Sequence, residues 1–154
     1  MKRFEGQVAL VTGASRGIGL AIAERLIAEG ARVCITARNA DALSEAVRSL
    51  GGQAVALGVA GHSDYGDHQD GAVTSTLVEY GRIDLLVNNA GINPSYGIVL
   101  DTSPSARQKV IDVNLLACLG WIEAVHNLRM KSVGGAIVNI SSVAGIRAAK
   151  GIGM

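Results

Sequence analysis

The sequence predicts an α/β fold, in which a doubly wound parallel sheet carries helices on both of its faces. Apolar segments of strand length alternate with longer segments of helical periodicity along the chain. These apolar segments are nearly continuous, as is typical of strands buried on both faces. Apolar residues make up 49% of the chain and aromatic residues only 3%, so Val, Ile, Leu and Ala must fill most of the core.

The elements follow one another in a regular order. Strands are expected at residues 7–13, 31–37, 53–60, 83–91 and 135–141, and helices at residues 17–30, 40–52, 67–81 and near 105–131. Right-handed crossovers between parallel strands favour the spatial strand order 3-2-1-4-5. No linker-like or repeated segment interrupts the pattern, so residues 1–154 are expected to form one domain.

Charge and composition argue against several classes of function. The 14 basic and 13 acidic residues are spread along the chain, and no run of Lys or Arg marks a surface for nucleic acid or anionic membranes. No apolar run is long enough to span a bilayer, and the N-terminus lacks the apolar core of a signal peptide. We therefore expect a cytoplasmic protein. The His and Cys residues are not spaced as a metal site requires, so no metal is expected.

The most informative motif is TGASRGIG, which lies between the first predicted strand and the first predicted helix. Its glycines allow a sharp turn and let the backbone approach a pyrophosphate, while the N-terminus of the following helix points at the anion. Such a turn can also serve only to pack a helix on a strand. Its place in a βαβ unit favours a dinucleotide site in a Rossmann-type fold. The candidate cofactor-binding residues of this loop are Gly13, Ser15, Arg16, Gly17, Ile18 and Gly19.

The end of the second strand predicts which dinucleotide binds. A site for NAD usually has Asp or Glu here, where it bonds the 2′-hydroxyl of the ribose. This chain has Thr36-Ala37-Arg38-Asn39, with no acidic residue. Arg38 and Arg16 can together bind a 2′-phosphate, because guanidinium groups pair bidentately with phosphate. We therefore predict NADP(H) rather than NAD(H), with Arg38 and Asn39 among the cofactor-binding residues.

A fifth strand, predicted to be buried, delivers Ser141 and Ser142 to the carboxyl edge of the sheet, where open α/β sheets bind their ligands. With this strand, four segments of the chain resemble the classical short-chain dehydrogenase/reductases, and most of all the 3-oxoacyl-acyl-carrier-protein reductases. The segments are TGASRGIG at 12–19, NNAG at 88–91, DVN at 112–114 and VNISS at 138–142. Each is weak alone, but together they occur in the family's order and at similar separations.

This resemblance implies an enzyme that reduces a ketone of the 3-oxoacyl type to an alcohol with NADPH, and whose full-length form is a homo-oligomer, either a dimer or a tetramer. It also implies roles for residues. Asn89, Ala90 and Gly91 would line the adenosine half of the cofactor and brace the fourth strand. Asn114 would hold a water molecule of a proton relay by bending the long helix locally. Ser142 would bond the substrate carbonyl or alcohol, and the backbone near Ile140 would lie on the nicotinamide side.

The sequence departs from the family's pattern after the third strand. The family usually has Asp or Asn followed by Val there, and the acidic or amide side chain meets the adenine amine. Here the corresponding pair is Gly58-Val59. Gly58 and Val59 are still expected beside the cofactor, and Asp64 in the following loop is a candidate for the missing contact.

A second departure concerns the family's acid–base pair, the Tyr and Lys of Y-x-x-x-K. The Tyr protonates the nascent alkoxide and the Lys lowers its pKa. Counting from Ser142 places this Tyr at about the first position after Met154, and no Lys follows Tyr65, Tyr80 or Tyr96 at four residues. The chain is therefore interpreted as the N-terminal portion of a longer enzyme, C-terminally truncated and inactive alone. Its last strand would then have an unpaired edge that is prone to association.

Two other classes of function are left as alternatives. One is a non-catalytic module that binds a dinucleotide or a partner and has no Y-x-x-x-K. Ser142 and Asn114 argue against it, because such a module has no use for them. The other is a methyltransferase, which is weaker, because its glycine loop normally follows an acidic residue where this chain has Val11-Thr12.

Overall fold

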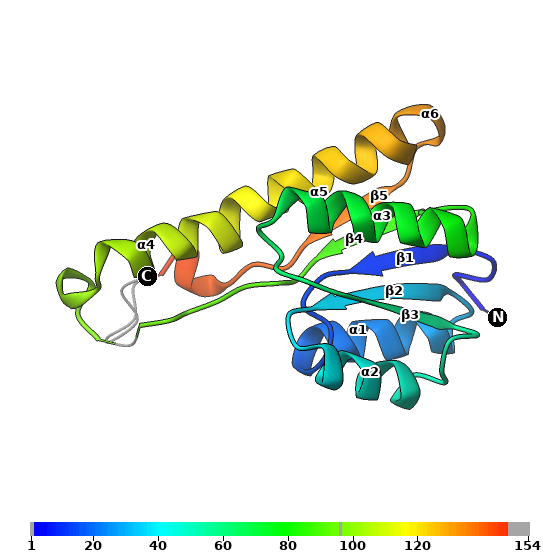
Figure 1. Ribbon diagram of the computed structural model, residues 1–154, viewed down its shortest axis with the longest axis horizontal. Helices are drawn as coiled ribbons and strands as arrows, with labels where there is room; N and C mark the ends of the chain where they lie inside the picture. The colour runs from blue at the N-terminus through cyan, green and yellow to red at the C-terminus, as the bar shows by residue number, and fades with distance from the viewer. Residues whose placement is uncertain (1, 96, 148–154) are drawn as a thin grey trace.

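The computed structural model describes residues 2–95 and 97–147, and its centre is a five-stranded sheet. The strands are Val8–Val11 (β1), Arg32–Ala37 (β2), Ala56–Ala60 (β3), Leu85–Asn88 (β4) and Ala136–Asn139 (β5). Neighbouring strands are parallel and their order is β3-β2-β1-β4-β5 (Figure 1). The predicted doubly wound α/β fold is confirmed, including its strand order.

Helices lie on both faces of the sheet (Figure 1). The first three are Gly17–Ala28 (α1), Ala40–Ser49 (α2) and Gly66–Tyr80 (α3). On β1, Val11 belongs to the hydrophobic cluster that includes residues of α1 and α2, whereas its neighbour Leu10 belongs to the cluster on the α3 face. Successive strand residues point to opposite faces. Because helices cover both faces of the central strands, most residues of these strands are apolar.

The long helix is present but is not uniformly α-helical. It consists of Pro104–Ile111 (α4), a π-helical turn at Asp112–Leu116, Ala117–Val125 (α5), a second π-helical turn at His126–Met130, and Lys131–Val133 (α6). Ser103 caps its start by accepting a 3.2 Å hydrogen bond from the Ala106 N–H. Gly134, with a φ of +75°, follows its last residue. The first π-helical turn interrupts the regular backbone pattern at the DVN segment.

The fifth strand is not buried, contrary to the prediction. Ile137 is 41% exposed and Val138 is 46% exposed. Among the described residues the strand lies at the edge of the sheet and pairs only with β4, and α1 and α2 pack against β1, β2 and β3 instead. A continuous apolar segment is buried only where elements cover both of its faces, and the described helices do not provide this cover for β5.

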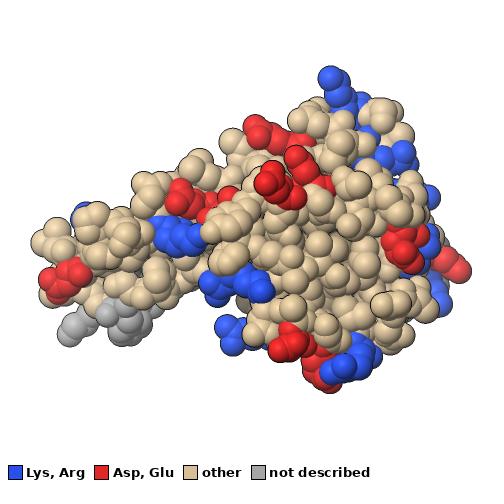
Figure 2. Space-filling model, in the orientation of Figure 1, with Lys and Arg blue, Asp and Glu red and all other residues tan. Residues whose placement is uncertain are grey.

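The surface carries charges of both signs. On the face drawn in Figure 2, Lys and Arg side chains are interspersed with Asp and Glu side chains, in keeping with the formal net charge of +1. Within the part of the chain that the structure describes, no helix has both the length and the apolar character needed to cross a membrane.

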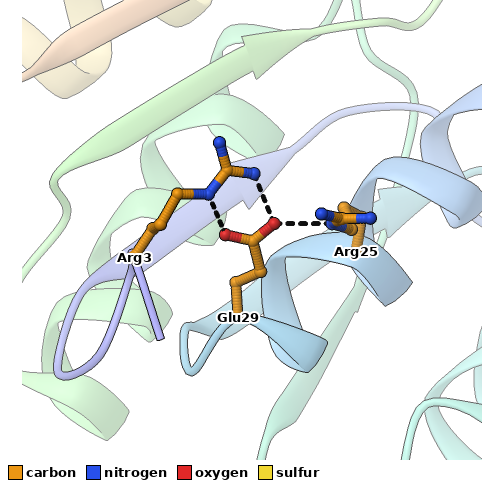
Figure 3. Close-up of polar contacts among 3 residues, drawn as sticks. All are labelled: Arg3, Arg25 and Glu29. Carbon is orange, nitrogen blue, oxygen red and sulfur yellow. Dashed lines mark hydrogen bonds and ion pairs between the residues drawn. The ribbon is translucent and has the colours of Figure 1, made fainter. Parts of the chain in front are cut away.

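An ion-pair cluster joins the N-terminal segment to the end of α1 (Figure 3). Both carboxylate oxygens of Glu29 accept hydrogen bonds from the Arg3 guanidinium, and one also accepts a 2.6 Å bond from Arg25 Nε. These bonds from Arg3 and then Arg25 outweigh burial and lower the pKa of Glu29 to about 2. Arg3 precedes β1 and Glu29 precedes β2, so the cluster lies at the edge of the sheet opposite the strands' carboxyl ends.

Candidate functional site

A cleft of about 1060 Å³ opens at the carboxyl edge of the sheet. The loops after β1, β2, β3 and β4 line it together with Lys109 and Val113 of the long helix. The predicted residues that line it are Gly13, Ser15, Arg16, Gly17, Ile18, Arg38, Asn39, Asn89, Ala90 and Gly91. Chain order reverses between β1 and β4, so the cleft stands at the switch point where open α/β sheets bind ligands.

The three glycines of the first loop differ in what they do. Gly13 has a φ of +64°, and a Cβ there would lie 2.8 Å from the Ala90 Cα. A Cβ on the buried Gly19 would overlap the Asn89 side-chain amide. These two glycines are needed for packing within the chain. Gly17 has a φ of +60°, and a Cβ there would meet no atom within 4 Å. Gly17 is therefore the glycine that leaves open space at the cleft.

The N-terminus of α1 meets the same open space. Arg16 is its N-cap residue, and no described side chain caps the helix. The first N–H groups of a helix have no partner within the helix, and they carry the positive end of its dipole. The turn at Gly17 thus presents unpaired donors where an anion can approach without meeting a side chain.

Asn89 and Thr12 hold the loops after β1 and β4 together. The Asn89 amide donates to the Thr12 carbonyl at 2.9 Å and to the Gly13 carbonyl at 3.1 Å. The Thr12 hydroxyl oxygen in turn accepts 3.0 Å bonds from the backbone N–H groups of Asn89 and Ala90. This geometry fits a bracing role for the NNAG segment and fixes two walls of the cleft relative to each other.

Two arginines lie in the cleft with free guanidinium groups. Arg16 and Arg38 are both exposed, and neither forms an ion pair within residues 2–95 and 97–147. Asn39 lines the cleft too, but its side chain caps α2 by accepting a 2.8 Å bond from a backbone N–H of the first turn. Glu45 also lines the cleft, and its carboxylate pairs with Arg48. The available charges at this end of the cleft are therefore positive.

Gly58 and Val59 do not line the cleft, in contrast to the expectation. Because β3 continues to Ala60, Gly58 lies within the strand, where a Cβ would approach side chains of α2 to 2.9 Å. Val59 packs against the hydrophobic cluster on the opposite face. The residues that reach the cleft from this side are Gly61–Asp64. His62 and Ser63 were not predicted to line the cleft. The sequence signal that could have indicated them is their place in a polar loop directly after the third strand.

Asp64, the candidate for the missing adenine contact, lines the cleft, but Lys109 binds its carboxylate. Lys109 Nζ donates to Asp64 Oδ2 at 2.6 Å. The other oxygen, Oδ1, is buried without a hydrogen-bond partner among the described residues. Burial by itself would raise the pKa of Asp64, but the bond from Lys109 and a backbone hydrogen bond outweigh it and hold this pKa below its usual value. Nothing in the sequence indicated Lys109, which is 45 residues away from Asp64.

Asn114 lies in the first π-helical turn, where the local bend was expected. Its Oδ1 accepts a 2.8 Å bond from the Ile92 N–H, and its Nδ2 donates a 2.8 Å bond to the Ile92 carbonyl. Asn114 itself does not line the cleft, whereas Ile92 and the preceding Val113 do. The side chain therefore fastens the loop after β4 to the long helix.

Ser142 and Ile140 lie outside the cleft lining. The Ser142 hydroxyl accepts a 3.1 Å bond from the Ala144 N–H and caps the short 3₁₀ turn Val143–Gly145. The Ile140 N–H donates to the Asn88 carbonyl at 2.8 Å and prolongs the pairing of β5 with β4. Tyr96, one of the three tyrosines considered above, lies outside the described residues. The structure thus brings the predicted cofactor loops together but not the two predicted catalytic side chains.

The strand order, the glycine turn and the cleft at the switch point define a Rossmann-type α/β protein. The family model described as short chain dehydrogenase matches residues 7–154. The chain belongs to this family.

Three relatives illustrate the similarity. Over 153 residues the chain is 42% identical to "Dehydrogenase/reductase SDR family member 4" of Caenorhabditis elegans, covering 98% of the chain and 59% of that protein. It is 41% identical over 150 residues to a 3-oxoacyl-[acyl-carrier-protein] reductase of Synechocystis, covering 95% and 60%. It is 39% identical over 146 residues to "Tropinone reductase-like 3" of Erythroxylum coca, covering 94% and 55%. The resemblance is confirmed, and the chain spans between 55% and 60% of the length of these relatives.

Proposed function

We propose that the chain binds NADP(H) in the cleft and forms the cofactor-binding part of an oxidoreductase that reduces a ketone of the 3-oxoacyl type to an alcohol. One observation carries the proposal. Three features line one cleft: the open turn at Gly17, the N-terminus of α1, and the guanidinium groups of Arg16 and Arg38. Among the described residues no side chain caps this helix and neither arginine forms an ion pair. Family membership supports the reaction class, and the name of the Synechocystis relative supports the type of substrate.

The residues of the cleft fit the parts of a phosphorylated dinucleotide. The pyrophosphate would lie at the N-terminus of α1, over the open side of Gly17 and within reach of Ser15. The 2′-phosphate would lie between Arg16 and Arg38, each of which can donate two parallel hydrogen bonds. The adenosine half would extend between the loop Gly61–Asp64 and the NNAG segment.

The catalytic steps divide among few residues. When bound, the nicotinamide ring supplies a hydride to the substrate carbonyl. Ser142 would donate its hydroxyl proton in a hydrogen bond to the carbonyl oxygen, and Asn114 would help to hold a water molecule for proton delivery. The sequence contains no Tyr followed by Lys at four residues to protonate the alkoxide. We therefore expect the 154-residue chain to bind the dinucleotide without measurable turnover.

The assembly and the location rest on the resemblance. We infer a homo-oligomer, either a dimer or a tetramer, in the cytoplasm. The long helix offers an apolar surface for contacts between subunits, since Leu115, Leu116 and Leu119 are 64%, 51% and 53% exposed. A small-molecule substrate is then the only further ligand that the reaction requires.

A non-catalytic dinucleotide-binding module is the alternative function. The position of Ser142 favours it, because this hydroxyl caps a turn and does not line the cleft. A longer form of the protein that contains a Tyr and Lys after residue 154 would separate the two functions. NADPH oxidation with a β-ketoester supports the reductase, and binding of NADPH without oxidation supports the module.

The cofactor preference can be tested by calorimetric titration of the 154-residue chain with NADPH and NADH. We expect NADPH to bind more tightly. Arg16→Gln and Arg38→Gln should each weaken NADPH binding by about tenfold, as for the loss of a bidentate phosphate contact, and leave NADH binding unchanged. Arg107→Gln is the matched control, because Arg107 is exposed and lies outside the cleft lining. Equal affinities for both dinucleotides would contradict the NADP(H) assignment, and no binding of either would contradict the proposed function.

A further inference from the structure

The loop Gly61–Tyr65, which follows β3, is fastened to the long helix on both sides of the first π-helical turn. Before the turn, Lys109 of α4 binds Asp64 at 2.6 Å. After the turn, the indole N–H of Trp121 donates to the Ser63 hydroxyl at 2.9 Å. The Gln69 amide adds a link, because it donates to the Ser63 carbonyl at 2.8 Å and to the carbonyl of the first residue of α5 at 3.4 Å.

The π-helical turn itself holds the neighbouring wall of the cleft. Asn114, in the middle of the turn, makes its two hydrogen bonds with Ile92 in the loop after β4. One stretch of the long helix, from Lys109 to Trp121, therefore positions the loops after both β3 and β4. A conformational change in the loop after β3 must therefore act on the same stretch of helix that holds the loop after β4.

The ion pair between Lys109 and Asp64 is the contact that most affects the position of the loop. The Asp64 side chain is only 9% exposed, and its second oxygen has no partner among the described residues. Without Lys109 a buried carboxylate would lose its cationic partner, so the loop would have to move to bring the carboxylate into water. Tyr65 would move with it. This ring lies 5.6 Å from Lys109 Nζ and stacks on His62, which lines the cleft.

We propose that Lys109 is a positioning residue of the dinucleotide site. Through its ion pair with Asp64 it holds the loop Gly61–Tyr65 in place. When a ligand occupies the adenosine end of the cleft, this ion pair couples the loop to the π-helical turn that contains Asn114. This inference rests on the proposed function and adds a means of regulation to it. A ligand that rigidifies the loop Gly61–Tyr65 also restrains Lys109 and the π-helical turn that follows it in the long helix. The coupling is reciprocal, so ordering of the turn also favours binding of the ligand. Cofactor binding thus orders the Asn114 turn before a substrate arrives.

The test uses adenosine 2′,5′-bisphosphate, which can fill the adenosine end and has no nicotinamide. Amide hydrogen exchange is followed at Ile92 and in the turn Asp112–Leu116, with the probe absent and saturating. We expect the probe to slow exchange at these sites by about three- to tenfold in the wild type and in the control Arg107→Met. In Lys109→Met this slowing is lost, and affinity for the probe falls by about two- to fivefold, as for a partly exposed ion pair.

The possible outcomes separate the inference from the proposed function. If the probe binds and slows exchange equally in Lys109→Met and in the wild type, the inference is wrong and the dinucleotide site stands. If neither the probe nor NADPH binds the wild type, the proposed function fails and the inference fails with it. Asp64→Ala is the second variant, and it should lose the slowing as well. Retention of the slowing in Asp64→Ala would show that the ion pair does not carry the coupling.

Discussion

The Asn114 side chain and the Ile92 backbone form two hydrogen bonds of 2.8 Å in opposite directions. The pair joins the π-helical turn of the long helix to the loop after β4. Such turns occur mostly as local insertions in α-helices and frequently at functional sites. The residue to which the family resemblance assigns a proton relay is thus also the residue that fixes one wall of the cleft.

Asn114→Ala should make the loop after β4 more mobile, because it removes both hydrogen bonds to Ile92. We expect faster amide exchange at Ile92 and a decrease of about 1 kcal/mol in the free energy of unfolding, since the lost hydrogen bonds are neutral and exposed. Hydrogen exchange and urea unfolding measure the two effects. Asn127→Ala is the control, because Asn127 lies in the second π-helical turn of the same helix, and no side-chain hydrogen bond is found for it among the described residues. Unchanged exchange at Ile92 in Asn114→Ala would contradict this role.

Substitutions at Gly13 and Gly17 should affect different properties, the first mainly stability and the second mainly NADPH affinity. Gly13→Ala forces a Cβ to 2.8 Å from the Ala90 Cα at a positive φ, so it should lower the free energy of unfolding by about 3 kcal/mol. Gly17→Ala meets no atom and should cost only about 1–2 kcal/mol for its positive φ. Its methyl group would nevertheless occupy the open side of the turn, so NADPH affinity should fall by about tenfold or more. Urea unfolding and calorimetry measure both quantities. Full NADPH affinity in Gly17→Ala would show that the phosphates bind elsewhere.

Glu29 should make stability depend on pH in the acid range. Hydrogen bonds from Arg3 and Arg25 lower its pKa to about 2 in the folded chain, from an ordinary value of 4.5. A lowered carboxylate pKa contributes stability that is fully present above the unfolded value and is lost as the pH falls through the folded value. The difference in unfolding free energy between wild type and Glu29→Gln should therefore shrink between pH 4.5 and about pH 2.

Urea unfolding at several pH values measures this difference. Glu24→Gln is the control, because Glu24 is an exposed carboxylate of the same helix and forms no ion pair within the described residues. A difference for Glu29→Gln that stays constant over the acid range would mean that the ionised carboxylate does not stabilise the fold.

The exposed edge at β5 should cause association. Within residues 2–95 and 97–147, β5 is an edge strand. Such a strand offers backbone groups for pairing, and the apolar side chains of Ile137 and Val138 add to its tendency to pair. Light scattering should show a molecular weight that rises with concentration, and Ile137→Lys should reduce this rise. Val78→Lys replaces an 81% exposed apolar residue of α3 and should have no effect. A monomer at all concentrations would contradict the prediction.

The order of the sheet was predictable because few topologies satisfy right-handed crossovers between parallel strands. The same constraint predicts that the glycine loop, Arg38 and the NNAG segment share one cleft, since the carboxyl ends of parallel strands lie at one edge. The expectation for Gly58 and Val59 came from the family resemblance. Both residues lie within β3, which ends at Ala60 as the predicted strand does, and the cleft lining on this side begins at Gly61.

Other features depend on tertiary contacts that no local pattern contains. The exposure of β5 follows from which elements cover it, and the apolar sequence of a strand is the same whether or not such elements are present. The Asp64–Lys109 pair joins two segments far apart in the chain, and neither residue has a distinctive neighbour. Of the three glycines expected to serve the phosphates, Gly13 and Gly19 instead face the NNAG segment, which only the packed structure reveals.

The most direct measurement for the central claim is a nuclear magnetic resonance titration of the uniformly ¹⁵N-labelled chain with NADPH. If the cleft is the dinucleotide site, the largest amide shift changes will occur at residues 13–19, 36–39, 61–64 and 89–92, with Gly17 among the strongest. Absence of shifts at saturating NADPH, or shifts confined to other surfaces, would contradict the assignment of this cleft.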